Sequence, residues 1–235
     1  MSLIQVNNVK AGYGKGSDVL RGLTFSVKQN DLAVIIGPNG SGKSTALKAI
    51  AGQLPISEGT ITIAGDVIAA RSGSRLHPSI AYVPQEGNVF PSLTVRENLE
   101  MGGYGLHGAV RARVAHVLNL FPALAERPGA QAKTLSGGQR QSLALAIALM
   151  VEPSVLLLDE PSAGLSPRAV NEMFATVRRL HAAGITIVMV EQNALAALAI
   201  ATQGVVLVLG KVRMSAAAKA IAVHADVRRM LLGGS

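Results

Sequence analysis

The residues best suited to chemistry in this 235-residue chain form a glycine-rich run that ends in a lysine and two hydroxyl residues. Its spacing fits a P-loop, and the run stands between an apolar stretch ending at Ile36 and a helical pattern beginning at Ser44. Glycines let backbone N–H groups turn toward phosphates, and the start of a helix adds its positive dipole end. The run therefore predicts a site for ATP and Mg²⁺ formed by Gly37, Pro38, Asn39, Gly40, Ser41, Gly42, Lys43, Ser44 and Thr45.

Two side chains of this run have specific expected roles. Lys43 would reach the β- and γ-phosphates, and the Ser44 hydroxyl would be a ligand of Mg²⁺. A glycine-rich turn without a ligand is the simpler alternative. The apolar strand before the run and the helix after it favour the phosphate site.

A pair of acids ends the apolar run at residues 155–158 and adds to this site. An acid at the carboxyl tip of a parallel strand lies near the nucleotide when the same sheet contains a P-loop. We expect Asp159 to hold Mg²⁺ through water and Glu160 to polarise the attacking water, so that Glu160 and Lys43 act as catalytic residues of an ATPase. Because strands often end in acids, the pair is specific only together with the P-loop.

A third segment, Leu-Ser-Gly-Gly-Gln at residues 135–139, opens a helix. Ser136 is suited to the N-cap position, and Gly137 and Gly138 leave backbone N–H groups exposed. A helix start of this kind is an anion site. An ordinary capped helix is the alternative, and the segment alone does not decide between the two.

The first half of the chain contains the elements that must position the P-loop. Residues 4–9, 19–27 and 60–63 are rich in β-formers and have glycines around them. Residues 31–36 end in a continuous apolar run, which is typical of a buried parallel strand. The apolar spacing of residues 93–151 is mostly helical and predicts a helical subdomain at residues 87–152, inside a single domain at 1–235.

Strands and helices alternate again in the second half. The pattern predicts strands at residues 155–158, 185–190 and 205–209, and a closing helix at 217–232. Ser166 and Gly184 suit the two ends of the helix between the first two of these strands. The alternation predicts an α/β fold whose sheet is mainly parallel and covered by helices on both faces.

Composition limits the partners and the compartment. The formal net charge is +8, but the basic residues are scattered and no aromatics lie between them, so nucleic acid is not an expected partner. Cysteine is absent, which rules out disulfides and thiolate metal sites. The start lacks the pattern of a signal peptide, and each apolar stretch is shorter than the roughly 20 residues of a membrane span. We expect a cytoplasmic protein that would work at a membrane only by docking on another molecule.

Together, the three motifs resemble the ABC ATPase family, and the pattern covers nearly the whole chain. The resemblance implies a P-loop NTPase fold with an N-terminal antiparallel β subdomain and the inserted helical subdomain. In that family two ATPase subunits pair head to tail, and each ATP lies between the P-loop of one subunit and the Leu-Ser-Gly-Gly-Gln segment of the other. The residues implied to contact the ATP of the partner are Ser136, Gly137, Gly138 and Gln139.

Further positions match the family residue by residue. Tyr13 stands where the family places an aromatic ring against adenine, although a tyrosine in a glycine-rich turn is a credible alternative. Gln85 matches the glutamine that contacts Mg²⁺ and water and senses the membrane partner. Residues 161–166 match the loop that crosses between the subunits, where Ser166 replaces an aspartate that the family often has.

Gln192 is the main departure from the family pattern. The family usually has a histidine at this position, where it contacts the γ-phosphate. A glutamine side chain can still donate a hydrogen bond, but it cannot become charged or relay a proton. A subunit that only binds or regulates without turnover is the alternative. The presence of Lys43, Asp159 and Glu160 favours an active site in which Gln192 is the third catalytic residue.

Two segments and the short C-terminal end resemble the shorter ATPase of branched-chain amino acid importers. The first segment is Val-Glu-Gln-Asn at residues 190–193, and the second is residues 88–99. This resemblance implies an ATPase dimer, two transmembrane permease subunits and an external substrate-binding protein. The dimer partner would be a second, paralogous ATPase or a second copy. Importers of urea share much of this pattern and stay open as an alternative. ABC ATPases of DNA repair or of ribosomes fit less well, because the chain lacks a coiled-coil insertion and a second cassette.

Overall fold

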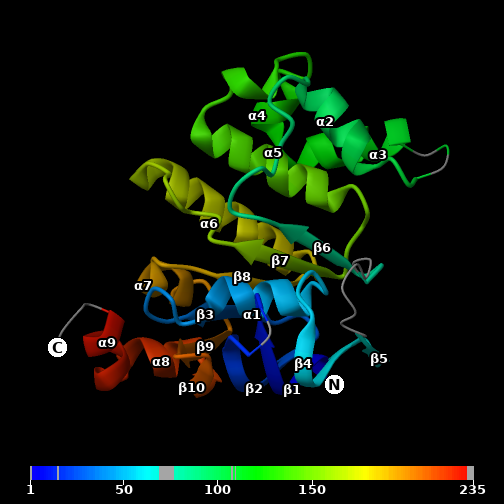
Figure 1. Cartoon of the computed structure of the whole chain (residues 1–235). Helices are drawn as coiled ribbons and strands as arrows, with labels where there is room; N and C mark the ends of the chain where they lie inside the picture. The colour runs from blue at the N-terminus through cyan, green and yellow to red at the C-terminus, as the bar shows by residue number, and fades with distance from the viewer. Residues whose placement is uncertain (1, 15, 69–76, 107, 109, 232–235) are drawn as a thin grey trace.

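The computed structural model describes residues 2–14, 16–68, 77–106, 108 and 110–231. Three layers are visible in Figure 1: an antiparallel sheet at the bottom, a mostly parallel sheet in the middle and a group of helices at the top. None of the helices in the described ranges has the length and apolar character that a membrane span requires.

The antiparallel sheet has the strand order β2-β1-β4-β5. Its strands are β1 (Ser2–Gly12), β2 (Asp18–Lys28), β4 (Ile56–Ile63) and β5 (Asp66–Val67). In β2 the residues Leu23, Phe25 and Val27 are buried, whereas the residues between them are exposed. This period of two places one apolar face toward the core. The strands predicted at 4–9, 19–27 and 60–63 are therefore confirmed, as is the N-terminal antiparallel subdomain.

The second sheet has the order β10-β9-β3-β8-β7-β6. Pairing is parallel from β9 to β6, and β10 is antiparallel to β9. The strands β3, β7 and β8 are buried along their whole lengths, which explains their continuous apolar runs. The strand bounds are β3 (Leu32–Ile36), β6 (Ile80–Val83), β7 (Val155–Asp159), β8 (Thr186–Val190), β9 (Gln203–Val208) and β10 (Lys211–Ala217).

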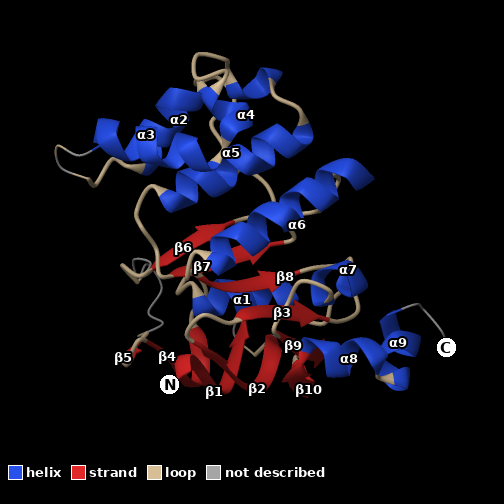
Figure 2. Ribbon diagram, turned by 180° about the vertical axis from the view of Figure 1, so that it is seen from behind, coloured by secondary structure: helices blue, strands red, loops and turns tan. Residues whose placement is uncertain are grey.

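Helices cover both faces of the parallel sheet, as predicted. In β3, Ala33 and Ile35 pack into the core that contains α1 (Lys43–Ile50), while Leu32 and Val34 face the opposite core. That opposite core contains α6 (Pro167–Ala182), which Figure 2 shows lying along the sheet, and α7 (Ala194–Leu198). The expected ends of α6 are confirmed, because Ser166 caps its start and Gly184, with φ +95°, follows its end.

The helices at the top of Figure 1 come from the chain between β6 and β7. The helix α5 packs against both α2 and α6, and so connects this group to the sheet layer. The elements are α2 (Val95–Gly102), α3 (Val110–Leu120), α4 (Pro122–Ala125), a 3₁₀ turn (Ala132–Thr134) and α5 (Gly137–Leu149).

A buried asparagine holds the entry to this helical group. Asn98 is fully buried; its Oδ1 accepts the N–H of Phe90 at 2.8 Å, and its Nδ2 donates to the carbonyls of Phe90, Leu93 and Thr94. We expect Asn98→Ala to lower the free energy of unfolding by about 2–4 kcal/mol, because it leaves buried backbone groups unpaired. Urea unfolding measures this, with the exposed Arg96→Ala as control. Equal stability of the two variants would contradict the prediction.

The C-terminal end differs from the predicted closing helix at 217–232. A tight turn with positive φ at Leu209 and Gly210 folds β10 back onto β9, and two short helices follow. These are α8 (Ala218–Val223) and α9 (Ala225–Leu231). The extended ψ of 118° at His224 separates them, so one helix cannot continue through this point. Residue 232 lies outside the described residues.

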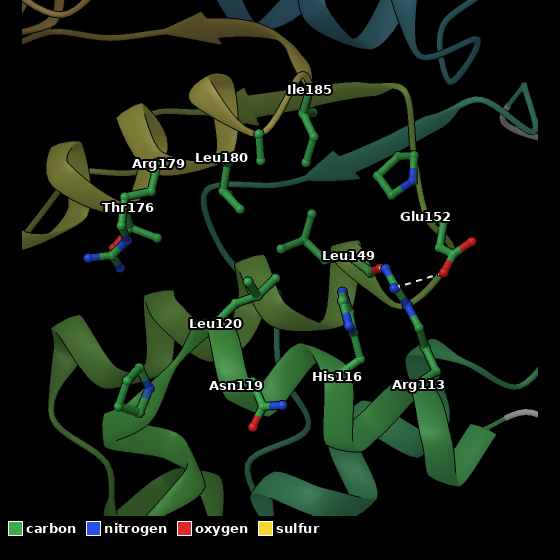
Figure 3. Close-up of a pocket in the computed structure, with 13 residues that line it drawn as sticks. Arg113, His116, Asn119, Leu120, Leu149, Glu152, Thr176, Arg179, Leu180 and Ile185 are labelled. Carbon is green, nitrogen blue, oxygen red and sulfur yellow. Dashed lines mark hydrogen bonds and ion pairs between the residues drawn. The ribbon is translucent and has the colours of Figure 1, made fainter.

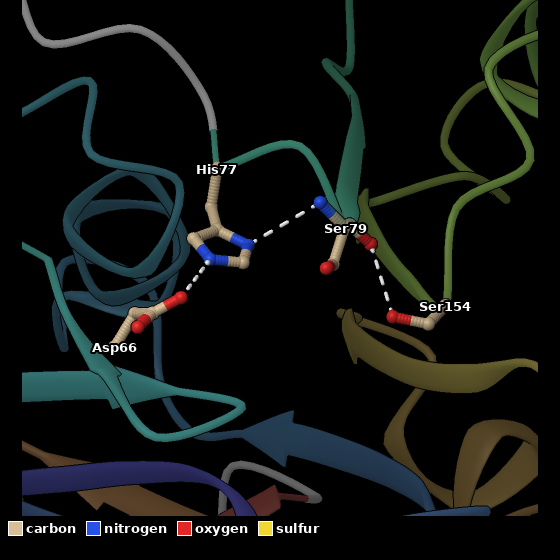
Figure 4. A network of polar contacts seen from close by, with 4 residues as sticks. All are labelled: Asp66, His77, Ser79 and Ser154. Carbon is tan, nitrogen blue, oxygen red and sulfur yellow. Dashed lines mark hydrogen bonds and ion pairs between the residues drawn. The ribbon is translucent and has the colours of Figure 1, made fainter.

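A small polar network joins the two sheets near β6 (Figure 4). His77 Nε2 lies 3.2 Å from the carboxylate of Asp66 on β5, and the N–H of Ser79 donates to His77 Nδ1. Since Nδ1 accepts, the proton of the neutral ring is on Nε2 and points to Asp66. The Ser154 hydroxyl donates to the carbonyl of Ser79, just before β7. These contacts position the start of β6 relative to both sheets.

Candidate functional site

Four groups of the predicted site residues follow four neighbouring strands. The glycine-rich run comes after β3, Gln192 after β8, Glu160 after β7 and Gln85 after β6. Parallel neighbours end at the same edge of a sheet, so these segments meet. They form a cleft that we call the nucleotide cleft, lined by Val19, Asn39, Gly40, Gly42, Lys43, Ser44, Thr45, Gln85, Glu160 and Gln192.

The start of α1 leaves backbone donors free for an anion. Thr94, Ser136 and Ser166 cap α2, α5 and α6 with their side chains, but the N-cap of α1 is Gly42, with φ +99°, which has no side chain to do so. The first N–H groups of a helix have no intrahelical partner, and phosphate oxygens are suited to accept from them.

Two more features of the loop fit a phosphate. A Cβ at Gly37 would lie 2.0 Å from the carbonyl oxygen of Leu207, so only glycine allows the chain to pass this close to β9. The Ser41 hydroxyl is buried and has no hydrogen-bond partner in the described part of the chain. A buried donor of this kind suits a ligand acceptor.

Lys43 places a cation inside the loop. Its side chain is buried, and Nζ donates to the carbonyls of Gly37 at 3.0 Å and Pro38 at 3.2 Å. Burial lowers the pKa of Lys43 from its ordinary 10.5, and the nearby carboxylates of Glu160 and Asp159 oppose this shift. A desolvated ammonium next to free backbone donors fits the charge of a polyphosphate.

Asp159 connects the P-loop to the neighbouring strands. Its Oδ1 accepts the Ser44 hydroxyl at 2.8 Å, and its Oδ2 accepts the Tyr82 hydroxyl at 3.0 Å. Burial and the Asp159 carboxylate raise the pKa of Tyr82, which keeps this hydroxyl protonated as a donor. The hydroxyl and carboxylate oxygens of Ser44 and Asp159, with Gln85 in the cleft, are ligands of the type that Mg²⁺ prefers.

Glu160 and Gln192 face each other across the ends of β7 and β8. Gln192 Nε2 donates to Glu160 Oε2 at 3.1 Å. Glu160 is buried and adopts a left-handed backbone with φ +47°, which is unusual for a residue with a side chain. Such strain at a cleft is typical of functional residues. The structure therefore brings the departure from the family pattern into direct contact with the predicted water-activating carboxylate.

We expect Gln192→Ala to lower kcat for ATP hydrolysis about tenfold, because it removes one hydrogen bond to a charged group. This loss is smaller than that expected for Lys43→Ala. Steady-state ATP hydrolysis by the two variants tests this prediction, with Asn193→Ala as the control at a neighbouring position. Equal losses in Gln192→Ala and Lys43→Ala would show that Gln192 is as essential as the lysine.

Tyr13 lies beside the start of α1. The residue is 63% exposed, its hydroxyl is 3.5 Å from Thr45 Oγ1, and the ammonium of Lys48 lies 5.8 Å from the ring centroid. An exposed ring next to a phosphate loop is suited to stack on a base. The contact with Lys48, one helical turn after Ser44, was not predicted.

The residues at 136–139 do not join the nucleotide cleft. Ser136 and Gln139 form a reciprocal capping box at the start of α5, at 3.3 and 3.0 Å. They line a separate pocket with Gly138, Ser166 and residues of α6. The described structure thus holds the two predicted halves of a nucleotide site apart on one chain.

A further cavity of about 690 Å³ lies between α3, the end of α5 and α6 (Figure 3). Leu120, Leu149 and Leu180 form its apolar wall, and Arg113 pairs with Glu152 at its rim at 2.8 Å. It opens near the amino ends of β7 and β8, whereas the nucleotide cleft lies at their carboxyl ends. None of the predicted site residues lines it.

Sequence comparison finds relatives over the whole chain. A family model described as ABC transporter matches residues 20–163. The high-affinity branched-chain amino acid transport ATP-binding protein BraG of Pseudomonas aeruginosa is 38% identical, over 99% of this chain and 100% of that protein. The probable branched-chain amino acid transport ATP-binding protein LivF of Archaeoglobus fulgidus is 36% identical, over 98% of this chain and 99% of its own length. The predicted resemblance to such ATPases is confirmed.

Solved structures agree with the sequence comparison. A crystal structure of the ADP conformation of an ATP-binding cassette of an ABC transporter has a TM-score of 0.87 at 26% identity, with 99% of both chains covered. A dimeric, post-hydrolysis cassette bound to ADP and phosphate has a TM-score of 0.80 at 26% identity, with 92% of this chain and 98% of that chain covered. The chain belongs to the ABC transporter family and is one of its ATPase subunits.

Proposed function

We propose that this ATPase energises the import of branched-chain amino acids. The observation that supports it most directly is the cleft in which Lys43, Glu160 and Gln192 meet the uncapped start of α1. The named activities of the two relatives, which align over nearly the entire chain, support the choice of substrate.

We also propose that the working unit is a dimer of two ATPase chains. Residues 136–139 lie in a pocket apart from the nucleotide cleft, so a second chain is needed to close a site between the two halves. The dimeric cassette with ADP and phosphate supports the same arrangement. The partner is a second ATPase or a second copy of this chain, with residues 87–152 as the helical subdomain that presents Ser136, Gly137 and Gly138.

The chemistry proposed for the chain is positioning and charge stabilisation. Lys43 and the free N–H groups of α1 neutralise phosphate charge, and Tyr13 stacks on the adenine. Glu160, held by Gln192, accepts a proton from the attacking water. Mg²⁺ bound through Ser44, Gln85 and Asp159 would supply positive charge to the phosphate oxygens.

Coupling to transport follows from the dimer. Closure of two subunits can move a permease only to the extent that ATP binds the closed state more tightly than the open one. We propose that two transmembrane permease subunits dock near Gln85, where the chain leaves β6 for the helical group, on the inner face of the membrane. An external binding protein would deliver the amino acid.

The test is to purify the complex with its permease subunits and measure ATP hydrolysis in vesicles. We expect the binding protein loaded with leucine, isoleucine or valine to stimulate hydrolysis. The matched control is the same complex with urea. Stimulation by urea, and none by the amino acids, would contradict the proposed substrate while leaving the ATPase intact.

A further inference from the structure

Glu191 is a buried carboxylate with no role in the chemistry described above. It directly follows β8, and only 1% of the residue is exposed. Its Oε1 accepts the backbone N–H of Ser162 at 2.9 Å, and its Oε2 accepts the hydroxyl of the same serine at 2.8 Å. The backbone of Asn193 also hydrogen-bonds to it.

This environment is costly for a charged group. No lysine or arginine forms an ion pair with Glu191 in the described residues. Burial raises the pKa of Glu191, and its hydrogen bonds with Ser162 and Asn193 oppose the shift. A buried acid without a cation is retained at a cost in stability, which points to a role in the site beside it.

The contact joins the two loops that contain the reacting residues. Ser162 stands two positions after Glu160, and Glu191 stands immediately before Gln192. The N–H of Glu160 donates to the carbonyl of Val190 at 3.0 Å, so the strained backbone of Glu160 is held on both sides. The Gln192–Glu160 hydrogen bond lies across the same pair of loops.

We propose that Glu191 is a positioning residue for ATP hydrolysis. By holding Ser162, it fixes the left-handed backbone of Glu160 and the separation between Glu160 and Gln192. Ser162 belongs to the loop at 161–166, so the same contact relates the reacting carboxylate to the segment that faces the second ATPase. The inference rests on the proposed assignment of Glu160 as the water-activating residue.

The test compares Glu191→Ala with Glu191→Gln in the assembled transporter. The alanine removes both contacts to Ser162. The carboxylate of Glu160 is then no longer held in place, which is expected to lower kcat between about tenfold and hundredfold. The KM for ATP should change less than about twofold, because the P-loop contacts remain. Glutamine can accept the Ser162 N–H and donate to its hydroxyl, so Glu191→Gln should restore most of the rate.

Two further variants separate positioning from folding. Thr176→Ala removes another buried polar side chain, on α6 and away from the cleft, and should leave kcat unchanged. Ser162→Ala deletes only one of the two contacts and should lower kcat less than Glu191→Ala; it also serves if Glu191→Ala does not fold. Wild-type kcat in Glu191→Ala or in Ser162→Ala overturns the proposal. So does a Glu191→Gln variant as slow as the alanine.

The readouts also distinguish this proposal from the proposed function. Stimulation by branched-chain amino acids is measured on the wild-type complex and tests the substrate. The change in kcat without a change in KM is measured on basal ATP hydrolysis by the wild-type and variant complexes and tests Glu191. If the amino acids do not stimulate hydrolysis, the result for Glu191 is unaffected, and a failed Glu191 test does not affect the substrate result.

Discussion

Glu160→Gln is expected to lower kcat for ATP hydrolysis by a factor of about 10²–10⁴ and to leave ATP binding intact. The amide has nearly the shape of the carboxylate and can still contact Gln192, but it cannot accept a proton from water. Because Glu160 makes no contact with the loop at residues 37–45 in the described hydrogen-bond network, the affinity for nucleotide should persist. Single-turnover hydrolysis and equilibrium binding of a fluorescent ATP analogue measure the two quantities separately.

The matched control is Glu86→Gln, an exposed acid next to Gln85. It changes the same chemical group at an exposed position, and should hydrolyse ATP at the wild-type rate. A Glu160→Gln variant with normal turnover would show that the water-activating residue is misassigned.

Lys43→Ala is expected to remove transport and to lower kcat/KM for ATP hydrolysis by about 10³ or more. The variant deletes the buried cation of the loop. This weakens both ATP binding and the stabilisation of charge during phosphoryl transfer. Uptake of labelled substrate into vesicles and hydrolysis by the same complex are the measurements. Unchanged transport in Lys43→Ala would refute the ATPase assignment of this cleft.

Stability gives an independent check on this variant. The pKa of Lys43 is lowered by burial, so at pH values between its folded and unfolded pKa the unfolded chain binds more protons. The contribution of Lys43 to the free energy of unfolding therefore rises with pH toward 10.5. It is lower at neutral pH, where the buried ammonium must be charged. Deleting the Lys43 side chain removes this cost at neutral pH, so the melting temperature without nucleotide should not fall below that of the wild type. The exposed Lys219→Ala is the control for a lost surface charge.

Much of the fold could be predicted because its signals are local. The alternation in β2, the continuous apolar run of β3 and the Ser166 and Gly184 boundaries of α6 each depend on neighbouring residues. The C-terminal end could not be predicted in the same way. No strand was predicted at β10, because lysine and alanine are depleted in strands, and only pairing with β9 makes these residues a strand.

The candidate site also has parts that could be predicted from local sequence and parts that could not. The P-loop is one continuous segment, so its residues are together in any fold that keeps the strand and the helix around it. The contacts from Tyr82 to Asp159 and from Glu191 to Ser162 join residues far apart in the chain. A charged residue directly after the apolar run of β8 was the available signal for Glu191, but acids often end strands.

The chemical groups of the site could be recognised from local patterns in the sequence: a phosphate loop, an acid pair after a buried strand, a capped glycine-rich helix start and a glutamine where the family pattern usually has histidine. How these parts meet depends on the pairing of strands that are far apart in the sequence. The strand order β3-β8-β7-β6 places the chain after β8 between the P-loop and Glu160. No local pattern specifies that order, because it depends on which strands pair. This pairing brings Gln192 into hydrogen-bond contact with Glu160, and Glu191 with Ser162. It also leaves residues 136–139 away from the cleft.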